Sequence, residues 1–406
     1  MRVSTANSFD NTVSLLARRQ AELASQQEKI ATGKRVQKPS DDPVAATLAE
    51  TAQNRLSRTQ ADLRLLETSR SSLQQAENGL AESGELIQKV RDLLVSAGNA
   101  TFGPSEREDI ARQLEGLREQ MIGVANLKDN AGRTLFGGLG GSATPFVDLY
   151  NPSGNSVQFN GQRGQAAAGN TSLPQALDGN AIWMRVPQGN GSFTLSLDTG
   201  NTGSVSTSMG EVTNPTALTG DDYRIDFAQV AGVMQYTVTN VTTPAANPMP
   251  GQTGVPYTNG MTIEFDGQSL QMNGQPAAGD QIDLVPSTNT DIFQVVQDAV
   301  DALRYTGANN NAHRTQELAR TMTELDAGHD RVLLARGRAG EWLNRADSLD
   351  TLMEDRSVDL KTENSRLVDL DMVKGLSDFK TMELGLEAAL KSYAQVQRLS
   401  LFQVIN

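Results

Sequence analysis

The C-terminal end of the chain constrains its fold most, because its residue pattern predicts an amphipathic helix that continues to residue 406. Apolar side chains recur there at steps of three or four, which places them on one face of a helix. This stripe contains Leu376, Phe379, Met382, Leu386, Leu390, Tyr393, Val396, Leu399 and Phe402. An uncovered apolar stripe needs a partner helix, and the partner can come from the same chain or from another copy.

A second apolar stripe lies near the N-terminus. It contains Phe9, Val13, Leu16, Leu23 and Ile30. Two such helices at the two ends of a chain can pair with each other, with copies in neighbouring subunits, or with both. Self-assembly is therefore the leading hypothesis. The candidate subunit interface consists of all the residues of both stripes except Met382.

The composition favours extended helical packing and an acidic surface. Aromatic residues make up 5% of the 406 residues, which favours elongated packing of Leu- and Ala-rich helices over one large core. The formal net charge of −13 argues against nucleic acid and against an anionic membrane as the main partner, because both attract basic surfaces. The absence of Cys excludes disulfides and thiolate metal sites.

No targeting segment is evident in the sequence. Residues 1–30 lack the apolar block of a signal peptide, and no stretch is apolar enough to span a membrane. We therefore expect a chain that is cytoplasmic or is exported without a cleaved signal, and that does not insert into a membrane.

The composition changes sharply between residues 137 and 286. This segment holds 11 of the 14 Pro, 22 of the 36 Gly, and 11 acidic against 3 basic residues, so helices are not expected in it. Alternating apolar residues at 193–197 and 223–227 predict strands. The clearest hairpin joins 261–265 to 268–272 through Asp266 and Gly267, which supply the positive φ angles of a tight turn.

Long helices are predicted on both sides of this segment. An apolar residue recurs at every seventh position in Leu66, Leu73, Leu80, Ile87 and Leu94. That repeat predicts a coiled-coil-like seam. After a break at 98–104, Ser105 and Glu108 predict a capping box, and Thr290 is predicted to cap the helix after the segment.

Together these patterns predict an α+β fold, in which both chain ends form an elongated antiparallel helical coiled-coil bundle and a β-rich domain is inserted in the middle. We divide the chain into three predicted domains. Residues 1–43 with 341–406 form a terminal coiled-coil assembly domain. Residues 44–136 with 287–340 form a helical rod domain, and residues 137–286 form a β-rich outer domain.

The loop after the N-terminal stripe contains two adjacent carboxylates. Asp42 is predicted to be an N-cap and Pro43 the first helical residue, because the fixed φ of proline suits that position. The candidate loop and cap residues are Pro39, Ser40, Asp41, Asp42 and Pro43. The two carboxylates could instead bind a metal, but no further carboxylate or histidine lies close in sequence, so capping is the favoured interpretation.

No pattern of catalytic residues is evident. The only histidines, His313 and His329, are sixteen residues apart and lack the spacing of a zinc-binding pair. The Gly-rich run at 137–141 lacks the Lys-Ser or Lys-Thr of a phosphate loop, and no Gly-x-Ser-x-Gly motif is present. Composition leaves a Ser-His-Asp arrangement open. We predict no enzyme activity, no cofactor and no metal.

Three segments resemble the bacterial flagellin family. They are residues 1–5 (Met-Arg-Val-Ser-Thr) with Phe9, residues 33–43, and the terminal helix with Ser400-Leu401-Phe402. The Pro-Ser-Asp-Asp-Pro run at 39–43 is the most specific of these, and it resembles the hook-associated branch of the family. The resemblance covers both flanks of the β-rich segment.

The resemblance implies a structural adaptor that joins the hook side of the bacterial flagellum to the flagellin filament. Its implied partners are the first hook–filament junction protein, flagellin and copies of itself in a ring. It also implies export to the extracellular flagellum by the type III apparatus, with a cytosolic export chaperone. The residues that this chaperone is expected to bind are Leu386, Leu390, Tyr393, Val396 and Leu399.

Other functions stay open. A filament flagellin would share the terminal helices but would polymerise indefinitely. A secreted binding module would use the acidic β-rich domain to recognise a glycan or a host surface. An Asp-based metal hydrolase comes last, because no ligand pattern supports it.

Overall fold

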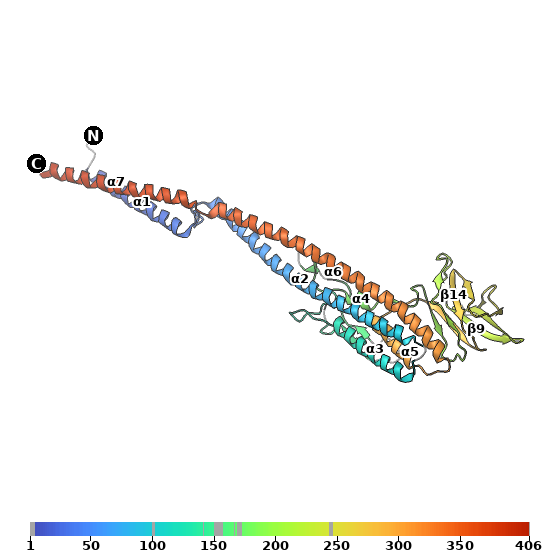
Figure 1. Cartoon of the computed structure of the whole chain (residues 1–406). Helices are drawn as coiled ribbons and strands as arrows, with labels where there is room; N and C mark the ends of the chain where they lie inside the picture. The colour runs from blue at the N-terminus through green and yellow to red at the C-terminus, as the bar shows by residue number, and fades with distance from the viewer. Residues whose placement is uncertain are drawn as a thin grey trace. The chain divides into compact units, whose positions relative to one another are not determined.

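The fold was obtained as a computed structural model, which describes residues 5–99, 102–140, 142–149, 157–165, 167–168, 173–242 and 247–405. Its helices are α1 (Thr5–Thr32), α2 (Pro43–Ala97), α3 (Pro104–Ala125), α4 (Gly179–Trp183), α5 (Ile292–Arg304), α6 (Asn310–Val368) and α7 (Met372–Ile405). The structure therefore combines N- and C-terminal helices with a central β-rich region, as the sequence predicts (Figure 1).

In the described part of the chain, sixteen strands lie between α3 and α5. They are β1 (Phe146–Asp148), β2 (Val157–Phe159), β3 (Ala167–Ala168), β4 (Leu173–Pro174), β5 (Val186–Pro187), β6 (Phe193–Leu197), β7 (Ser206–Thr207), β8 (Glu211–Val212), β9 (Tyr223–Val230), β10 (Val233–Asn240), β11 (Asn247–Pro248), β12 (Val255–Pro256), β13 (Thr262–Phe265), β14 (Gln268–Asn273), β15 (Gln281–Pro286) and β16 (Asn289–Thr290).

The chain forms two compact units. The first consists of Met1–Arg64 and Ser348–Asn406, and the second is Leu65–Asp347. The long helices α2 and α6 each contribute residues to both units. The three predicted domains and their boundaries stay a prediction.

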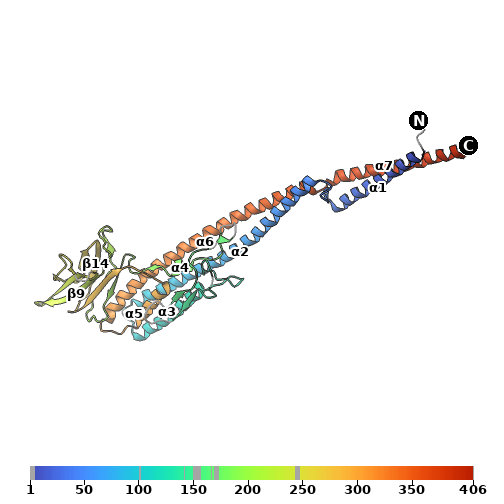
Figure 2. The same cartoon turned by 180° about the vertical axis from the view of Figure 1, so that it is seen from behind.

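In the first unit, α1 and α7 lie side by side and run antiparallel (Figures 1 and 2). The Gln26 side chain of α1 donates a hydrogen bond to the carbonyl oxygen of Gly375 in α7 at 3.1 Å. The unit has few buried side chains, and most of them are small. Its buried apolar residues are Val36, Ala45, Ala49, Ala52, Leu56 and Leu360.

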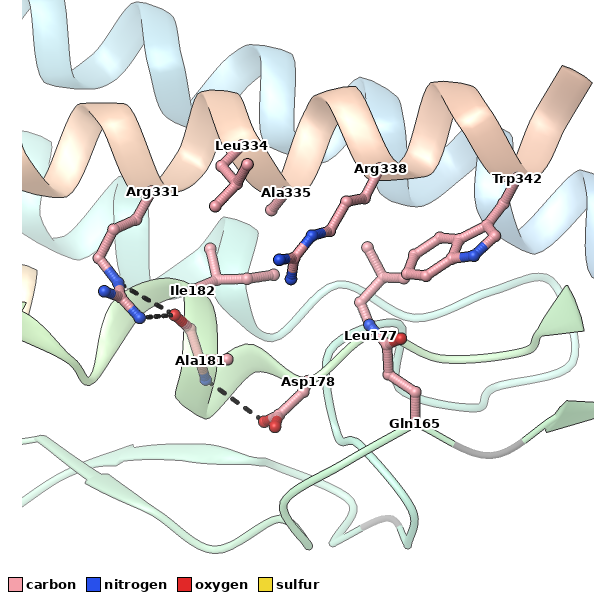
Figure 3. A pocket seen from close by; sticks show the side chains of 10 residues that line it. All are labelled: Gln165, Leu177, Asp178, Ala181, Ile182, Arg331, Leu334, Ala335, Arg338 and Trp342. Carbon is pink, nitrogen blue, oxygen red and sulfur yellow. Dashed lines mark hydrogen bonds between the residues drawn. The ribbon is translucent and has the colours of Figure 1, made fainter.

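The second unit has two apolar cores. In the helical core, four predicted heptad residues of α2, from Leu73 to Leu94, pack with α3, α5 and α6. All five heptad residues, Leu66 included, are at most 2% exposed. Arg331 of α6 holds α4 against this core by donating to the carbonyl oxygen of Ala181 at 3.1 and 2.8 Å (Figure 3). The seam that the sequence predicts is therefore buried.

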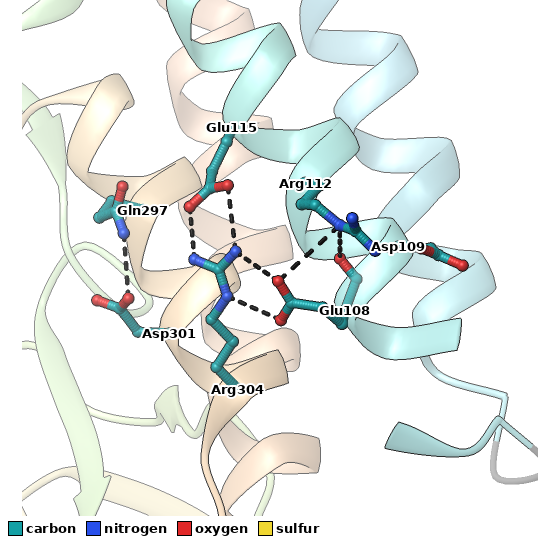
Figure 4. A network of polar contacts seen from close by, with 7 residues as sticks. All are labelled: Glu108, Asp109, Arg112, Glu115, Gln297, Asp301 and Arg304. Atoms are coloured by element: carbon teal, nitrogen blue, oxygen red, sulfur yellow. Dashed lines mark hydrogen bonds and ion pairs between the residues drawn. The ribbon is translucent and has the colours of Figure 1, made fainter. Parts of the chain in front are cut away.

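A polar network joins α3 to α5 at the edge of the helical core. Arg304 donates to both carboxylate oxygens of Glu108, at 3.0 and 2.9 Å, and also pairs with Glu115 (Figure 4). Hydrogen bonding to Arg304 lowers the pKa of Glu108. These side chains are well exposed, so the network aligns the two helices more than it stabilises them.

The second core lies within a β-sandwich. One sheet has six strands in the order β11-β10-β9-β15-β6, with β12 also on β10, and the other has four, with β13-β14-β7 and β8 on β14. The rings of Tyr223 and Phe265 meet between the sheets at 5.0 Å. The predicted hairpin is confirmed, because β13 pairs with β14 across Asp266 and Gly267, whose φ angles are +44° and +74°.

Three local predictions are wrong. The helix after the insert begins at Ile292, and the buried Asp291 caps it by accepting from the Gln294 amide, so Thr290 is not the cap. Pro104 already opens α3, and the preceding Gly103 makes no side-chain cap. Glu108 therefore pairs across to Arg304 instead of completing a capping box. The insert also contains a helix, α4, where none was expected.

Candidate assembly surface

The terminal helices are joined to the rest of the chain at a double break in the first unit. The chain leaves α1 and enters α2 opposite the point where it leaves α6 and enters α7. Leu370 N–H donates to the Gly33 carbonyl oxygen at 2.8 Å, and Arg35 N–H donates to the Val368 carbonyl oxygen at 2.7 Å. Gly33 has a φ of +68°, a value that glycine adopts without strain. Backbone pairing thus couples the two helix breaks.

The loop Pro39–Pro43 is organised by its two carboxylates. Asp41 Oδ2 accepts from the amides of Gln37 and Lys38, both at 3.0 Å. Asp42 Oδ1 accepts from the Ala45 amide at 2.9 Å, as an N-cap residue does, and Pro43 is the first residue of α2. Backbone hydrogen bonds are the main cause of the lowered pKa of Asp41 and of Asp42, so both carboxyls are ionised at neutral pH.

Arg35 ties this loop to the second break. Its guanidinium pairs with Asp42 Oδ2 at 3.1 Å and donates to the Leu367 carbonyl oxygen at 2.8 Å. The loop carboxylates are therefore used within the chain. Among the described residues, no group of three or more His, Asp or Glu is placed to hold a metal ion. The chemistry of the loop is that of a structural joint.

The predicted interface residues fall into two groups in the structure. One group has half-buried side chains and consists of Leu16, Leu23, Ile30, Phe379, Leu386 and Tyr393. Those with exposed side chains are Val13, Leu376 and Leu390, at 43%, 53% and 46%. The side chains of Phe9, Val396, Leu399 and Phe402 lie outside the described residues.

Exposed apolar side chains are concentrated on the first unit. It contributes 11 of the 19 large apolar side chains that the structure describes as exposed, although it holds under a third of the chain. Sequence periodicity missed most of them, because they lie off the two stripes: Leu15, Val44, Leu48, Leu352, Val358, Met372, Val373 and Leu384. Their signal in the sequence is an apolar residue that falls outside the main repeat, alone or with one apolar neighbour.

An apolar surface of this kind points to a protein partner. Soluble monomers rarely expose contiguous large apolar patches, and such patches mark interaction sites. Within the described residues, no helix is long and apolar enough to cross a membrane. What the surface can do chemically is to bury Leu, Val and Met side chains against another helix.

Comparison with known proteins finds flagellar relatives of the chain. A model described as the bacterial flagellin N-terminal helical region matches residues 3–140. The flagellar hook-associated protein 3 of Salmonella typhimurium is 26% identical, with 100% of this chain and 99% of that protein covered. The chain is therefore similar to the bacterial flagellin family over its N-terminal region and to a hook-associated protein along its whole length, as the Pro-Ser-Asp-Asp-Pro segment predicts.

Solved structures show the same similarity. The flagellar hook-associated protein-3 of Legionella pneumophila superposes with a TM-score of 0.70 and 26% identity, covering 78% of this chain and 98% of that one. By contrast, polar flagellin F of Vibrio parahaemolyticus is 24% identical over only 37% of this chain and 40% of its own length. The chain therefore matches hook-associated relatives along its length and a filament flagellin only in part.

Proposed function

We propose that this chain is a structural adaptor of the bacterial flagellum that joins the hook side to the flagellin filament. The observation that carries the proposal is the end-to-end match to flagellar hook-associated protein 3, set against the partial match to flagellin. The exposed apolar surface of the first unit supports it, because an adaptor must bind neighbours on two sides. The adaptor works by assembly and catalyses no reaction.

The terminal helices supply the assembly interface in this proposal. Half-buried residues such as Leu16 and Leu386 hold α1 and α7 together, and exposed residues such as Val13, Leu376 and Leu390 contact neighbouring subunits. The partners are the first junction protein, flagellin and further copies in a ring. On assembly, we expect α1 and α7 to join a coiled coil with these neighbours, since each isolated pair leaves apolar surface uncovered.

Export precedes assembly. We propose that the chain reaches the extracellular flagellum through the type III apparatus without a cleaved signal, and that a cytosolic chaperone covers the C-terminal stripe on the way. The chaperone would bind Leu386, Leu390 and Tyr393, together with Val396 and Leu399. It would thereby prevent premature assembly in the cytosol, because the same apolar residues serve both partners in turn.

The deciding experiment is electron microscopy of ordered assembly. Purified protein is added to hook fragments that carry the first junction protein, and flagellin is added afterwards. A junction adaptor adds a short layer, stops, and then supports filament growth. Unlimited growth by the protein alone would identify it as a filament flagellin and would overturn the proposal.

Two matched pairs of variants test the interfaces. Leu376→Asp should abolish addition to the fragments, whereas Ser377→Asp, one residue away, should leave addition intact. Leu390→Asp should abolish chaperone binding in calorimetry, whereas Ser392→Asp should not. Equal chaperone affinity for Leu390→Asp and the unchanged chain would remove the chaperone assignment.

A secreted binding module is the second candidate. It is favoured only by the acidic β-rich segment, with 11 acidic and 3 basic residues between 137 and 286. Specific binding of the full chain to a glycan array, together with failure to add to hook fragments, would favour this function over the adaptor.

A further inference from the structure

A cleft in the second unit lies between α6 and α4 and has a volume of about 160 Å³. Its floor is apolar, and Leu177, Ile182 and Trp342 contribute to it. Figure 3 shows Arg331 and Arg338 reaching into the cleft from α6. Leu334, at the edge, is 58% exposed. The cleft therefore combines an apolar floor with cationic side chains at its edge.

Positive charge exceeds negative charge at this cleft, because Arg331 and Arg338 line it together with one carboxylate, that of Asp178. Burial, and then the nearby Arg185 and Arg338, lower the pKa of the Arg331 guanidinium. The hydrogen bonds of Arg331 go to a carbonyl oxygen, and among the described residues no carboxylate forms an ion pair with Arg185 or Arg338. The Asp178 carboxylate accepts from the amides of Gly164 and Asn180 and balances one of the two charges. In a chain of net charge −13, the remaining positive charge of the cleft, with Arg185 close to Arg331, marks a site for an anionic partner.

The same helix carries a complementary segment further along the sequence. Residues 331–345 contain four arginines and one glutamate, whereas residues 347–359 contain five carboxylates and one arginine. In the acidic segment, Leu352 is 64% exposed. Asp355 and Asp359 follow it at three and seven residues, so the apolar side chain and both carboxylates share one helix face.

We propose that the cleft receives residues 350–359 of α6 from a second copy of this chain. Leu352 of that copy would cover the apolar edge at Leu334, and its Asp355 and Asp359 would pair with the arginines. Arginine and carboxylate form charge-assisted, often bidentate hydrogen bonds, which favour one register over others. The inference rests on the proposed function, because it assigns a contact between copies in the assembled layer.

The contact would be heterologous, since the cleft of one copy would bind a different surface of the next. Heterologous contacts propagate and produce rings or helical assemblies, whereas an isologous contact would end at a dimer. Each copy would still offer one free cleft and one free acidic face after binding a neighbour. That property matches a protein that assembles in a layer.

Disulfide trapping tests the contact directly, because the chain has no Cys of its own. Leu334→Cys and size-tagged Leu352→Cys proteins are mixed, assembled on hook fragments that carry the first junction protein, and oxidised. We expect a mixed disulfide between the two variants. Either variant alone should give at least about tenfold less disulfide-linked dimer, and so should the control mixture of Leu334→Cys with Val230→Cys. Normal assembly without the mixed disulfide would overturn the inference and leave the proposed function standing.

A charge exchange provides an independent readout. Arg338→Glu should reduce layer formation about tenfold, as should Asp355→Arg combined with Asp359→Arg, because like charges then oppose each other. Combining all three substitutions should restore assembly, which a simple folding defect would not allow. The matched control is Arg163→Glu, which reverses an exposed arginine outside the cleft.

The failures of the two proposals are distinguishable. If the unsubstituted chain does not add to hook fragments, the proposed function and the inference fall together. If Arg338→Glu weakens only the later addition of flagellin, the cleft binds flagellin and the contact between copies is wrong. Full assembly by Arg338→Glu would also overturn the inference alone.

Discussion

Glu324 of α6 is the residue whose ionisation should most affect the second unit. Its carboxyl is fully buried, and its Oε1 accepts from the Gly189 amide at 2.8 Å. For Oε2, the part of the chain that the structure describes offers no hydrogen-bond partner. Arg320 is already paired with Asp298 and Glu317. Burial therefore raises the pKa of Glu324 from 4.5 to about 7.

The direction of the pH effect follows from this raised pKa. The folded chain holds the Glu324 proton more tightly than the unfolded chain, so the stabilisation is complete below the unfolded pKa of 4.5. It is lost progressively as the pH rises through a folded pKa of about 7. A raise of between two and three pKa units corresponds to about 3 kcal/mol, at about 1.4 kcal/mol per unit.

Glu324→Gln removes the charge and keeps an oxygen acceptor for the Gly189 amide. The substitution should leave the free energy of unfolding nearly unchanged at pH 4 and raise it by about 3 kcal/mol at pH 8. Urea unfolding followed by tryptophan fluorescence measures this, because Trp183 and Trp342 both lie in the second unit. Glu341→Gln, at an exposed position of the same helix, is the control. A constant difference between Glu324→Gln and the unsubstituted chain across this pH range would refute the reasoning.

Three further predictions concern packing, a close backbone approach and the joint. Leu80→Ala empties a site that is 0% exposed and should lower the free energy of unfolding by about 2–5 kcal/mol in the same urea assay. Gly138→Ala should prevent folding, because its Cβ would lie 1.8 Å from the Gln162 carbonyl oxygen. The control Gly132→Ala meets no atom within 4 Å and should fold. Equal circular dichroism spectra for the two variants would contradict this prediction. Asp42→Ala should increase hydrogen exchange in the first turn of α2, and unchanged exchange would show that the cap does not hold that turn.

Periodicity was sufficient for the parts of the fold that depend on local repetition. The heptad from Leu66 to Leu94 predicts a buried seam because a helix brings every seventh residue to one side, whatever covers it. Asp266 and Gly267 predict their turn because few residues adopt positive φ. The family resemblance was also evident from short motifs. The loop at 39–43 is one of them, because its residues are set by local capping.

Local signals were insufficient where the partner of a side chain is distant in sequence. Glu108 fits a capping box by spacing, yet it pairs with Arg304, which α5 brings alongside α3. Thr290 and Asp291 are both acceptable caps by residue type, and the backbone path into α5 decides for Asp291. Similarly, local signals did not predict the short helix Gly179–Trp183, four of whose residues are buried. Arg331, which is distant in sequence, holds this helix in place.

The sequence alone established the helical flanks, the β-rich insert and the resemblance to flagellar proteins, because each depends on spacing, turn chemistry or motif. The division of the stripe residues into half-buried and exposed sets was decided only by tertiary structure. A helical pattern gives the direction of a side chain, whereas its exposure depends on which helix lies opposite. The arginine cleft has the same origin, because folding alone brings Arg185 of the insert close to Arg331 of α6.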